Sequence, residues 1–104
     1  MKTLFVVNQI RGDAWDHNTP IRSQALWDEH AAFMDRLTAD GFVVLGGPLG
    51  DPEGEAMLVV DAPDEETVQA TLARDPWRES GHLLAPKIQR WTIFLNSNQA
   101  AEEQ

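Results

Sequence analysis

The feature that most constrains the fold is the order in which strand-like and helix-like patterns follow one another along the 104 residues. Four short runs rich in β-branched and apolar residues predict strands. Two longer segments with apolar residues at a 3.6-residue period predict helices. The predicted strands cover residues 3–10, 42–47, 55–61 and 87–95, and the predicted helices cover residues 20–40 and 64–75. This order is typical of an α+β, ferredoxin-like β-α-β-β-α-β domain, with a four-stranded antiparallel sheet and two helices on one face.

The ends of the predicted helices carry recognisable residues. Thr19 and Pro20 suit the N-cap and the first helical position of the first helix, and Gly41 suits its left-handed stop. Asp64 suits the N-cap of the second helix. Pro76 predicts the end of that helix, because the residue before a proline avoids the α region.

The length and composition indicate one globular domain, with 42% hydrophobic and 24% charged residues. We expect this domain to cover residues 1–95. Residues 96–104 are polar and acidic, and we expect a disordered tail there. Nothing in the sequence approaches the length of a membrane span, and the apolar N-terminal run is too brief for a signal peptide. A cytoplasmic location is therefore the default expectation.

The charge and the lack of cysteine exclude several classes of function. The formal net charge is −9, with 17 acidic and 8 basic residues. Nucleic acid and anionic membranes are therefore not expected as partners, because both require clustered lysine and arginine. The chain contains no cysteine, which excludes disulfides, thiolate catalysis and cysteine-ligated metal centres.

Two predicted strands contain continuous apolar runs, at residues 4–7 and 42–45. A strand of an antiparallel sheet with one face in water should instead alternate apolar and polar residues. Both faces of the sheet are therefore predicted to be buried, and the short chain has no segment left to cover the second face. We expect a second copy of the chain to cover it, which predicts a homodimer.

The residues best suited to chemistry are His30 and Asp75. His30 shares one helical stripe with Leu26, Phe33 and Leu37, so its imidazole is expected to face the core. An imidazole in a pocket between helix and sheet can act as a general acid or base, and a nearby carboxylate would fix its tautomer. Asp75 is the candidate for that carboxylate, because at the C-terminus of a helix it would oppose the helix dipole. The simpler alternatives are a core histidine bonded to a backbone carbonyl and an aspartate that caps or forms a turn.

Further candidate residues surround this pair. Residues 46–54, with Gly46, Gly47 and Pro48, are interpreted as a turn whose glycines also let a ligand approach the backbone. The loop of residues 11–18 has two interpretations: an ordinary solvated connection, or a lid with Trp15 packing over the pocket and Arg11 meeting an anionic group. Three further loop residues lack a recognised metal-ligand spacing, so no metal site is predicted. Those residues are Asp13, Asp16 and His17. His82 is interpreted as an ordinary loop residue, within a loop that runs from Gly81 to Pro86.

These residues together resemble the YciI-like, or YCII-related, proteins. The resemblance covers residues 1–95 and rests on the helix-one histidine, on GFVVLGGPL, on DAPDEETVQATLARDPW and on the closing IQRWTIF. It implies a dimeric α/β barrel, in which two ferredoxin-like sheets pack face to face, and a proposed active site built on a histidine–aspartate pair. The matching positions are His30 and Asp75, with Trp77 beside the aspartate as a further substrate contact. One characterised branch of the family removes chloride from a chlorinated hydroxyhydroquinone.

The leading hypothesis is a small lyase or isomerase that acts without metal or organic cofactor on a small cyclic or aromatic-derived molecule. His30 would be the general base and Asp75 its orienting carboxylate. One alternative is a non-catalytic dimeric module that binds a small metabolite or serves as an accessory domain. Another is a cofactor-free monooxygenase, which the fold alone does not separate from the lyase or isomerase.

Overall fold

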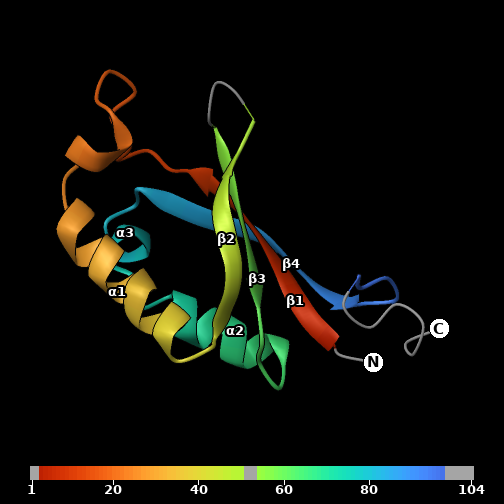
Figure 1. Cartoon of the computed structure of the whole chain (residues 1–104). Helices are drawn as coiled ribbons and strands as arrows, with labels where there is room; N and C mark the ends of the chain where they lie inside the picture. The colour runs from red at the N-terminus through yellow and green to blue at the C-terminus, as the bar shows by residue number, and fades with distance from the viewer. Residues whose placement is uncertain (1–2, 51–53, 98–104) are drawn as a thin grey trace.

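The computed structural model describes residues 3–50 and 54–97 of the chain. Within them the polypeptide forms one four-stranded antiparallel sheet with helices on one face (Figure 1). The strands lie in the order β2-β3-β1-β4, so β2 and β4 are the edges. This arrangement confirms the predicted ferredoxin-like α+β fold. In chain order the elements are β1 (Thr3–Arg11), η1 (Ile21–Ser23), α1 (Trp27–Ala39), β2 (Val43–Leu49), β3 (Glu55–Val60), α2 (Glu65–Leu72), α3 (Pro76–Glu79) and β4 (Leu83–Thr92).

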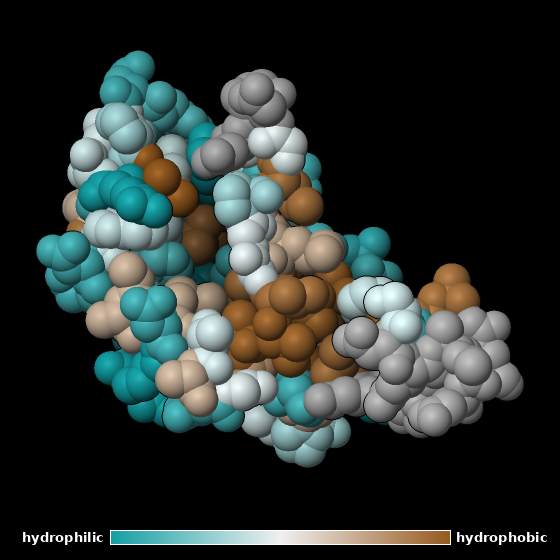
Figure 2. All heavy atoms as spheres, in the orientation of Figure 1, coloured by the Kyte–Doolittle hydropathy of each residue, from teal (hydrophilic) through white to brown (hydrophobic). Residues whose placement is uncertain are grey.

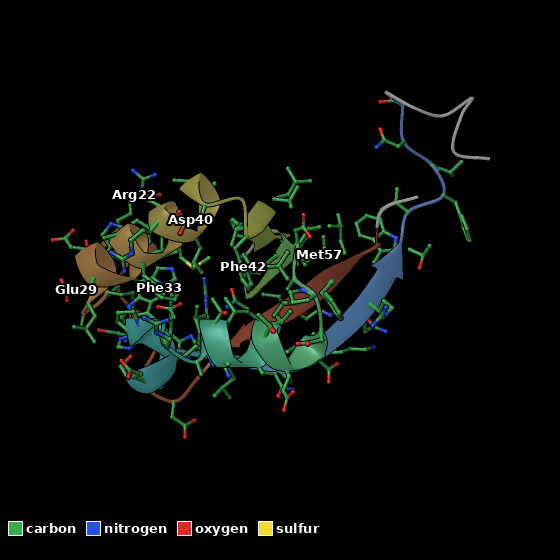
Figure 3. All side chains as sticks on the ribbon, turned by 90° about the horizontal axis from the view of Figure 1, so that it is seen from below. Arg22, Glu29, Phe33, Asp40, Phe42 and Met57 are labelled. Carbon is green, nitrogen blue, oxygen red and sulfur yellow. The ribbon has the colours of Figure 1, made fainter. Side chains whose placement is uncertain are left out.

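The core lies between the sheet and the helices. It is built from buried side chains on the helix-facing side of the strands and on α2, which are Phe5, Val7, Val43, Leu58, Val60, Val68 and Leu72. Phe33 of α1 lies on the side of that helix that faces α2 and α3, whereas Glu29 of α1 and Arg22 of η1 lie on the outer side (Figure 3). A second buried cluster of Trp15, Trp77 and Leu83 lies beside α3. That second cluster forms one wall of the site described below.

The first helix begins later than predicted. Residues 21–23 form a short 3₁₀ helix, and α1 starts at Trp27 because Leu26 adopts a left-handed conformation with φ of 65°. The buried Gln24 amide donates to the backbone oxygens of Asp16 and Thr19, which holds this segment outside the helix. Leu26 is exposed and does not belong to the helical stripe. The predicted end is confirmed, since Gly41 has φ of +82° after the last helical residues.

Gly46, Gly47 and Pro48 are not a turn. They lie inside β2 and pair with Leu58, Met57 and Ala56 of β3. Because β2 is an edge strand, a proline is tolerated in it. The connection that does turn includes Gly50, with φ of +73°. Part of the predicted turn, residues 51–53, lies outside the described residues.

The last strand also begins earlier than predicted, at Leu83, and includes Pro86. The predicted loop through Pro86 is therefore wrong. β4 is the other edge of the sheet, and its register with β1 shifts between Asn8 and Ile10, opposite the segment that holds this proline. Residues 98–104 of the predicted tail lie outside the described residues. None of the helices in the described part of the chain has the length and apolar content needed to cross a bilayer.

The sheet face opposite the helices exposes large apolar side chains. The strand register places on this face Ile10, Leu45, Leu49, Leu84 and Trp91, each of which is exposed. Figure 2 shows apolar residues gathered over the strands on the side turned away from α1. The continuous apolar runs of the sequence therefore correspond to a sheet whose second face, in the described part of the chain, carries large exposed apolar side chains.

Candidate functional site

His30 and Asp75 are in contact. The imidazole Nδ1 of His30 lies 2.9 Å from each carboxylate oxygen of Asp75. The His30 side chain is 13% exposed, and the Asp75 side chain is 1% exposed. An ionised carboxylate can only accept hydrogen bonds, so Nδ1 is the donor in this contact. This leaves Nε2 as the second ring nitrogen, and no described residue forms a hydrogen bond with it.

The local sequence explains why Asp75 is held in this position. α2 ends at Leu72 with Ala73 as its C-cap, and Asp75 is the N-cap of the separate short helix α3. Its Oδ1 accepts a hydrogen bond from the backbone N–H of Trp77 at 2.9 Å, and Pro76 occupies the first helical position. The interpretation of Asp75 as the C-terminal residue of a helix is therefore wrong, because Asp-Pro begins a helix here. Its carboxylate is satisfied by one backbone N–H and one imidazole.

Trp77 lies between two histidine rings. Its indole stacks on His30 with ring centroids 4.0 Å apart and 11° between the planes. His82 stacks on the indole as well, at 5.7 Å and 13°. His82 lies in a loop, as predicted, but it is not an ordinary loop residue, since it is buried and its Nδ1 lies 2.6 Å from the Ser80 hydroxyl. Trp15 completes the cluster with an edge-on contact to Trp77 at 5.2 Å.

The turn that leads into α1 is tied to the same indole. Trp77 Nε1 donates to the backbone oxygen of Ala25 at 2.7 Å. The next residue, Leu26, is the only described residue other than glycine with a positive φ. A left-handed leucine costs roughly 1–2 kcal/mol, so the surrounding contacts must hold it. Strained residues of this kind concentrate near functional sites. Here the strained residue is the N-cap of α1, so it fixes the start of the helix and thereby the position of His30 in its first turn.

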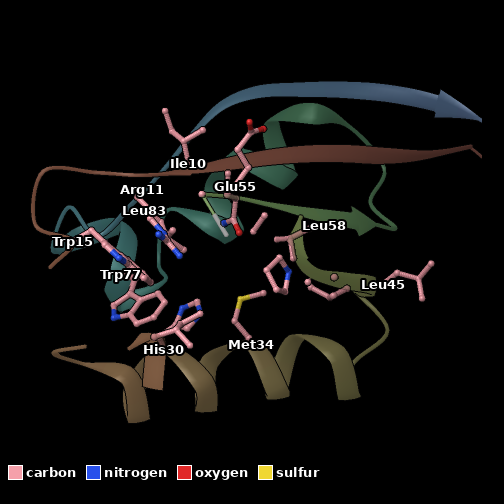
Figure 4. Close-up of a pocket in the computed structure, with 18 of the residues that line it drawn as sticks. Ile10, Arg11, Trp15, His30, Met34, Leu45, Glu55, Leu58, Trp77 and Leu83 are labelled. Carbon is pink, nitrogen blue, oxygen red and sulfur yellow. The ribbon is translucent and has the colours of Figure 1, made fainter. Parts of the chain in front are cut away.

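A cavity of about 500 Å³ opens in front of the His30 imidazole, between α1 and the sheet. Figure 2 shows a hollow between α1 and β2, and Figure 4 shows the residues around it, with His30 and Trp77 side by side and Met34 nearby. The predicted residues that line the cavity are Arg11, Trp15, His30, Gly46, Gly47, Pro48 and Trp77. Asp75 lies behind the imidazole and does not line it. The remaining wall is mostly apolar and includes Ile21, Trp27, Val43, Leu58 and Leu83.

The β1–α1 loop lies over this site, but not as a free lid. Trp15 is buried in the cluster with Trp77 and Leu83, and the Arg11 guanidinium lies 4.4 Å from the centre of its ring. Gly12 N–H donates to the His82 backbone oxygen at 2.9 Å, which ties the loop to the start of β4. The loop is therefore a packed wall of the cavity. No carboxylate among the described residues forms an ion pair with Arg11.

Gln9 lines the cavity and had no place among the predicted site residues. It is 3% exposed, and its Nε2 has no hydrogen-bond partner among the described residues. The sequence did contain a relevant pattern. Gln9 continues the series Phe5, Val7 along the core-facing side of the first strand, where an apolar residue is expected.

The three loop residues discounted as metal ligands do not come together. The Asp16 carboxylate accepts from the Thr19 hydroxyl at 2.7 Å and from the Asn18 backbone N–H at 2.9 Å. The hydrogen bond from Thr19, and secondly that from Asn18, lowers the pKa of Asp16 below its ordinary value. Among residues 3–50 and 54–97, no group of three or more His, Cys, Asp and Glu side chains is placed to hold a metal ion.

Comparison with known proteins gives a family and a structural neighbour. The model of the YCII-related domain matches residues 1–92 of the chain. No curated protein matches it in sequence. A 5-chloro-2-hydroxyhydroquinone dehydrochlorinase from Burkholderia phenoliruptrix AC1100, solved in complex with 2,5-dihydroxybenzoquinone, is similar in structure. The TM-score is 0.59 at 22% identity, over 86% of this chain and 93% of the dehydrochlorinase. This likeness shows a shared fold.

Proposed function

We propose that this chain, which belongs to the YCII-related family because that family's model spans residues 1–92, is a small proton-transfer enzyme. Its class would be that of a lyase or isomerase, and its substrate a small cyclic or aromatic-derived molecule. The observation that carries the proposal is the His30–Asp75 contact at 2.9 Å beside a cavity of about 500 Å³. A cavity of this size lies within the range of about 300–1,000 Å³ that small-molecule sites occupy.

His30 is the proposed general base. With Nδ1–H donated to Asp75, the lone pair of the neutral imidazole is on Nε2, the nitrogen that can accept a proton from a substrate. The Asp75 carboxylate holds the tautomer and stabilises the imidazolium formed when Nε2 is protonated. Because Asp75 also caps α3 through Trp77 N–H, the carboxylate keeps one orientation throughout. The dyad supplies this chemistry from the side chains of the chain itself.

The walls of the cavity support a ring-shaped substrate. The half-buried Trp27 presents aromatic surface on which a planar ring can stack or rest edge-on, and the buried Trp15 and Trp77 line the same cavity. The β2 wall brings backbone close to the cavity at Gly46 and Gly47, where no side chain takes up space. The structural neighbour, which is a dehydrochlorinase of a hydroxyhydroquinone, was solved with a ring compound bound.

The proposed step begins when Nε2 of His30 removes a proton from a carbon next to a carbonyl. The electrons of the broken bond move into the substrate as an enolate. In an isomerase the imidazolium returns the proton to a different carbon. In a lyase the enolate instead expels a leaving group, such as chloride, with its bonding electron pair, and the proton passes to solvent. Each route balances without an oxidant or reductant.

The test is solvent deuterium incorporation. Hydroxylated and chlorinated ring compounds and unsaturated lactones are incubated with the protein in D₂O, and exchange or turnover is followed by proton NMR. His30→Gln is expected to lower the rate by about 10²–10⁴-fold, the usual contribution of a general base. His17→Gln is the matched control, because His17 is exposed on the loop and does not line the cavity.

Two results would overturn the proposal. If His30→Gln reacts at the native rate, the base lies elsewhere. If compounds bind at the cavity but none exchanges or reacts, the protein is a small-molecule-binding module and not an enzyme.

We also propose that the protein works as a homodimer. The support is the face of exposed apolar side chains opposite the helices, with Leu45 at 67% exposure and Leu84 at 48%. Contiguous exposed apolar surface of this kind marks interaction sites in soluble proteins. A second copy placed face to face would remove it from water, as in the dimeric barrels that the resemblance to YCII-related proteins implies.

A further inference from the structure

We infer that Gln9 recognises the substrate, its Nε2 donating a hydrogen bond to an acceptor oxygen of a ring compound held in the His30 cavity. The acceptor would be a carbonyl or an ionised hydroxyl. This inference rests on the proposed function for the location of the substrate, and it adds the substrate's chemical class. The substrate must carry an oxygen on the edge of its ring that faces β1.

The first observation is an unsatisfied buried amide. Gln9 is 3% exposed, and its Nε2 has no hydrogen-bond partner among the described residues, although Gln9 lines the cavity. Buried polar atoms in native proteins are almost always hydrogen-bonded, and each exception requires an explanation. A ligand oxygen in the cavity supplies the missing acceptor.

The second observation is the position of Gln9 in the strand. Phe5 and Val7 precede it on the same face of β1 and belong to the apolar core. Gln9 pairs with Ala56 of β3, whose small side chain leaves room on the cavity side, and the β1–β4 register shifts at this point. An apolar side chain would continue the core here without a desolvation cost. The amide is therefore not explained by packing, and a role in binding accounts for it.

The third observation concerns charge around the same edge. Arg11 lies two residues further on the same face of β1 and also lines the cavity. Its guanidinium rests on Trp15 and has no carboxylate partner in the described part of the chain. Gln9 and Arg11 thus offer donors along one strand. Glu55 also borders the cavity, but its register partner Ile10 places it on the open face of the sheet, and Figure 4 shows it beside Ile10 and away from His30.

These three observations point to a ligand with an electron-rich oxygen toward β1 and its reacting C–H toward His30. Arginine favours an ionised oxygen, and a glutamine amide donates equally to an ionised or a carbonyl oxygen. A hydroxylated quinone or an ionised phenol offers an oxygen that can accept from both the guanidinium and the amide. A hydrocarbon ring of the same size would leave Nε2 unpaired.

The experiment measures binding of two probes by NMR titration. 2,5-Dihydroxybenzoquinone offers acceptor oxygens, and toluene is a ring of similar width without any. Gln9→Met keeps the length of the side chain and removes its donor, and Gln9→Leu is a second variant of the same kind. Gln69→Met is the matched control, because Gln69 is exposed on α2 and does not line the cavity.

Gln9→Met and Gln9→Leu are expected to weaken binding of the dihydroxybenzoquinone at least about tenfold, as loss of a hydrogen bond to a charged acceptor does. Toluene binding should be unchanged or tighter, and the thermal unfolding midpoint should stay the same or rise. Gln69→Met should change none of these. In the native chain, the Gln9 side-chain amide resonances should shift when the dihydroxybenzoquinone is added.

Three outcomes would overturn the inference. The first is equal dihydroxybenzoquinone affinity in the native chain and both Gln9 variants. The second is an equal loss for both probes, which indicates a structural role. The third is a native chain that binds toluene but not the dihydroxybenzoquinone. If His30→Gln leaves catalysis unchanged while binding still depends on Gln9, only the proposed catalytic role fails.

Discussion

The imidazole of His30 lies flat against the indole of Trp77, with ring centroids 4.0 Å apart and an interplanar angle of 11°. The indole is itself fixed, because Trp77 is 1% exposed and its Nε1 donates to the Ala25 oxygen. Asp75 then fixes the rotation of the imidazole through Nδ1. The N-cap of α3 and a residue of its first turn therefore determine the tautomer and the plane of a side chain on α1. Such support is what holds a functional group in one productive geometry.

The first prediction concerns the tautomer of His30. In the native chain, we expect the neutral imidazole to carry its proton on Nδ1 and its lone pair on Nε2, since the Asp75 carboxylate can only accept. Asp75→Asn keeps a good N-cap for α3 but presents an amide that can also donate. The Nδ1–H tautomer should therefore lose its dominance. Long-range proton–nitrogen NMR correlations measure the two tautomers directly, and an unchanged population in Asp75→Asn would show that the carboxylate does not determine it.

The second prediction concerns the stability contributed by Trp77. Trp77→Ala should lower the free energy of unfolding by about 3–5 kcal/mol, because it removes a fully buried indole. Trp77→Phe retains an aromatic ring against His30 but loses the hydrogen bond to Ala25 and some volume, so its cost should be smaller. Urea unfolding curves give both values. Equal losses for the two variants would indicate that ring stacking contributes little.

The third prediction compares two adjacent glycines of β2. A Cβ on Gly46 would lie 2.6 Å from Cδ2 of the buried Leu58, whereas a Cβ on Gly47 would meet no atom within 4 Å. Gly46→Ala should therefore lower the unfolding free energy by about 1–3 kcal/mol, the usual cost of overpacking. Gly47→Ala should be neutral or stabilising by up to about 1 kcal/mol. A reversed order of the two would contradict the close approach of β2 to Leu58.

The fourth prediction concerns acid stability at the start of α2. The Thr67 hydroxyl, and then its backbone N–H, donate to Asp64 and lower the pKa of that carboxyl below its ordinary value of 3.8. The unfolded chain therefore binds this proton more readily than the folded chain. The resulting stabilisation is fully present above pH 3.8 and is lost as the pH falls through the lower folded-state pKa.

Asp64→Asn tests this sign, because asparagine caps the helix without titrating. Urea unfolding of both chains near neutral pH and in acid below the ordinary pKa of 3.8 should show the native advantage shrinking in acid. An advantage that stays constant or grows in acid would contradict the prediction.

The fifth prediction concerns association through the open face of the sheet. Light scattering after gel filtration should give twice the chain mass for the native protein. Leu45→Glu and Leu84→Glu should shift it toward the monomer, because each places a charge among exposed apolar side chains. Ala70→Glu is the control, since Ala70 is exposed on α2, which covers the other face of the sheet. A native monomer at high concentration, or dissociation by Ala70→Glu, would contradict the dimer.

The sequence by itself determined the fold class, because alternating strand and helix periods reflect local geometry. It also determined the N-cap at Asp64 and the left-handed stop at Gly41, since both depend on residues that are neighbours in the chain. It identified His30 and Asp75 as the residues to examine. Their contact follows from the fold, in which α3 packs beside the first turns of α1.

Tertiary structure decided where the first helix begins and where the second strand ends. The predicted first helix is interrupted before Leu26. The Gln24 amide bonds back to the backbone oxygens of Asp16 and Thr19, and the Trp77 indole, 52 residues further along the chain, bonds to the Ala25 oxygen. Gly46, Gly47 and Pro48 extend a strand because β3 supplies the pairing and the edge position tolerates the proline. Local preference favoured a turn there, and pairing with β3 outweighed it.

The same reason explains the residues that sequence reasoning missed. His82 has an ordinary loop context in sequence, and its burial, its contact with Ser80 and its stack on Trp77 are seen only in the folded chain. Gln9 differs from Phe5 and Val7 on the same face of β1 only by being polar. That its Nε2 is buried without a hydrogen-bond partner is seen only in the folded chain, where β1, β3 and α1 surround the cavity. Periodicity records which way a side chain faces. Whether that side chain finds a partner is decided by residues far away along the chain.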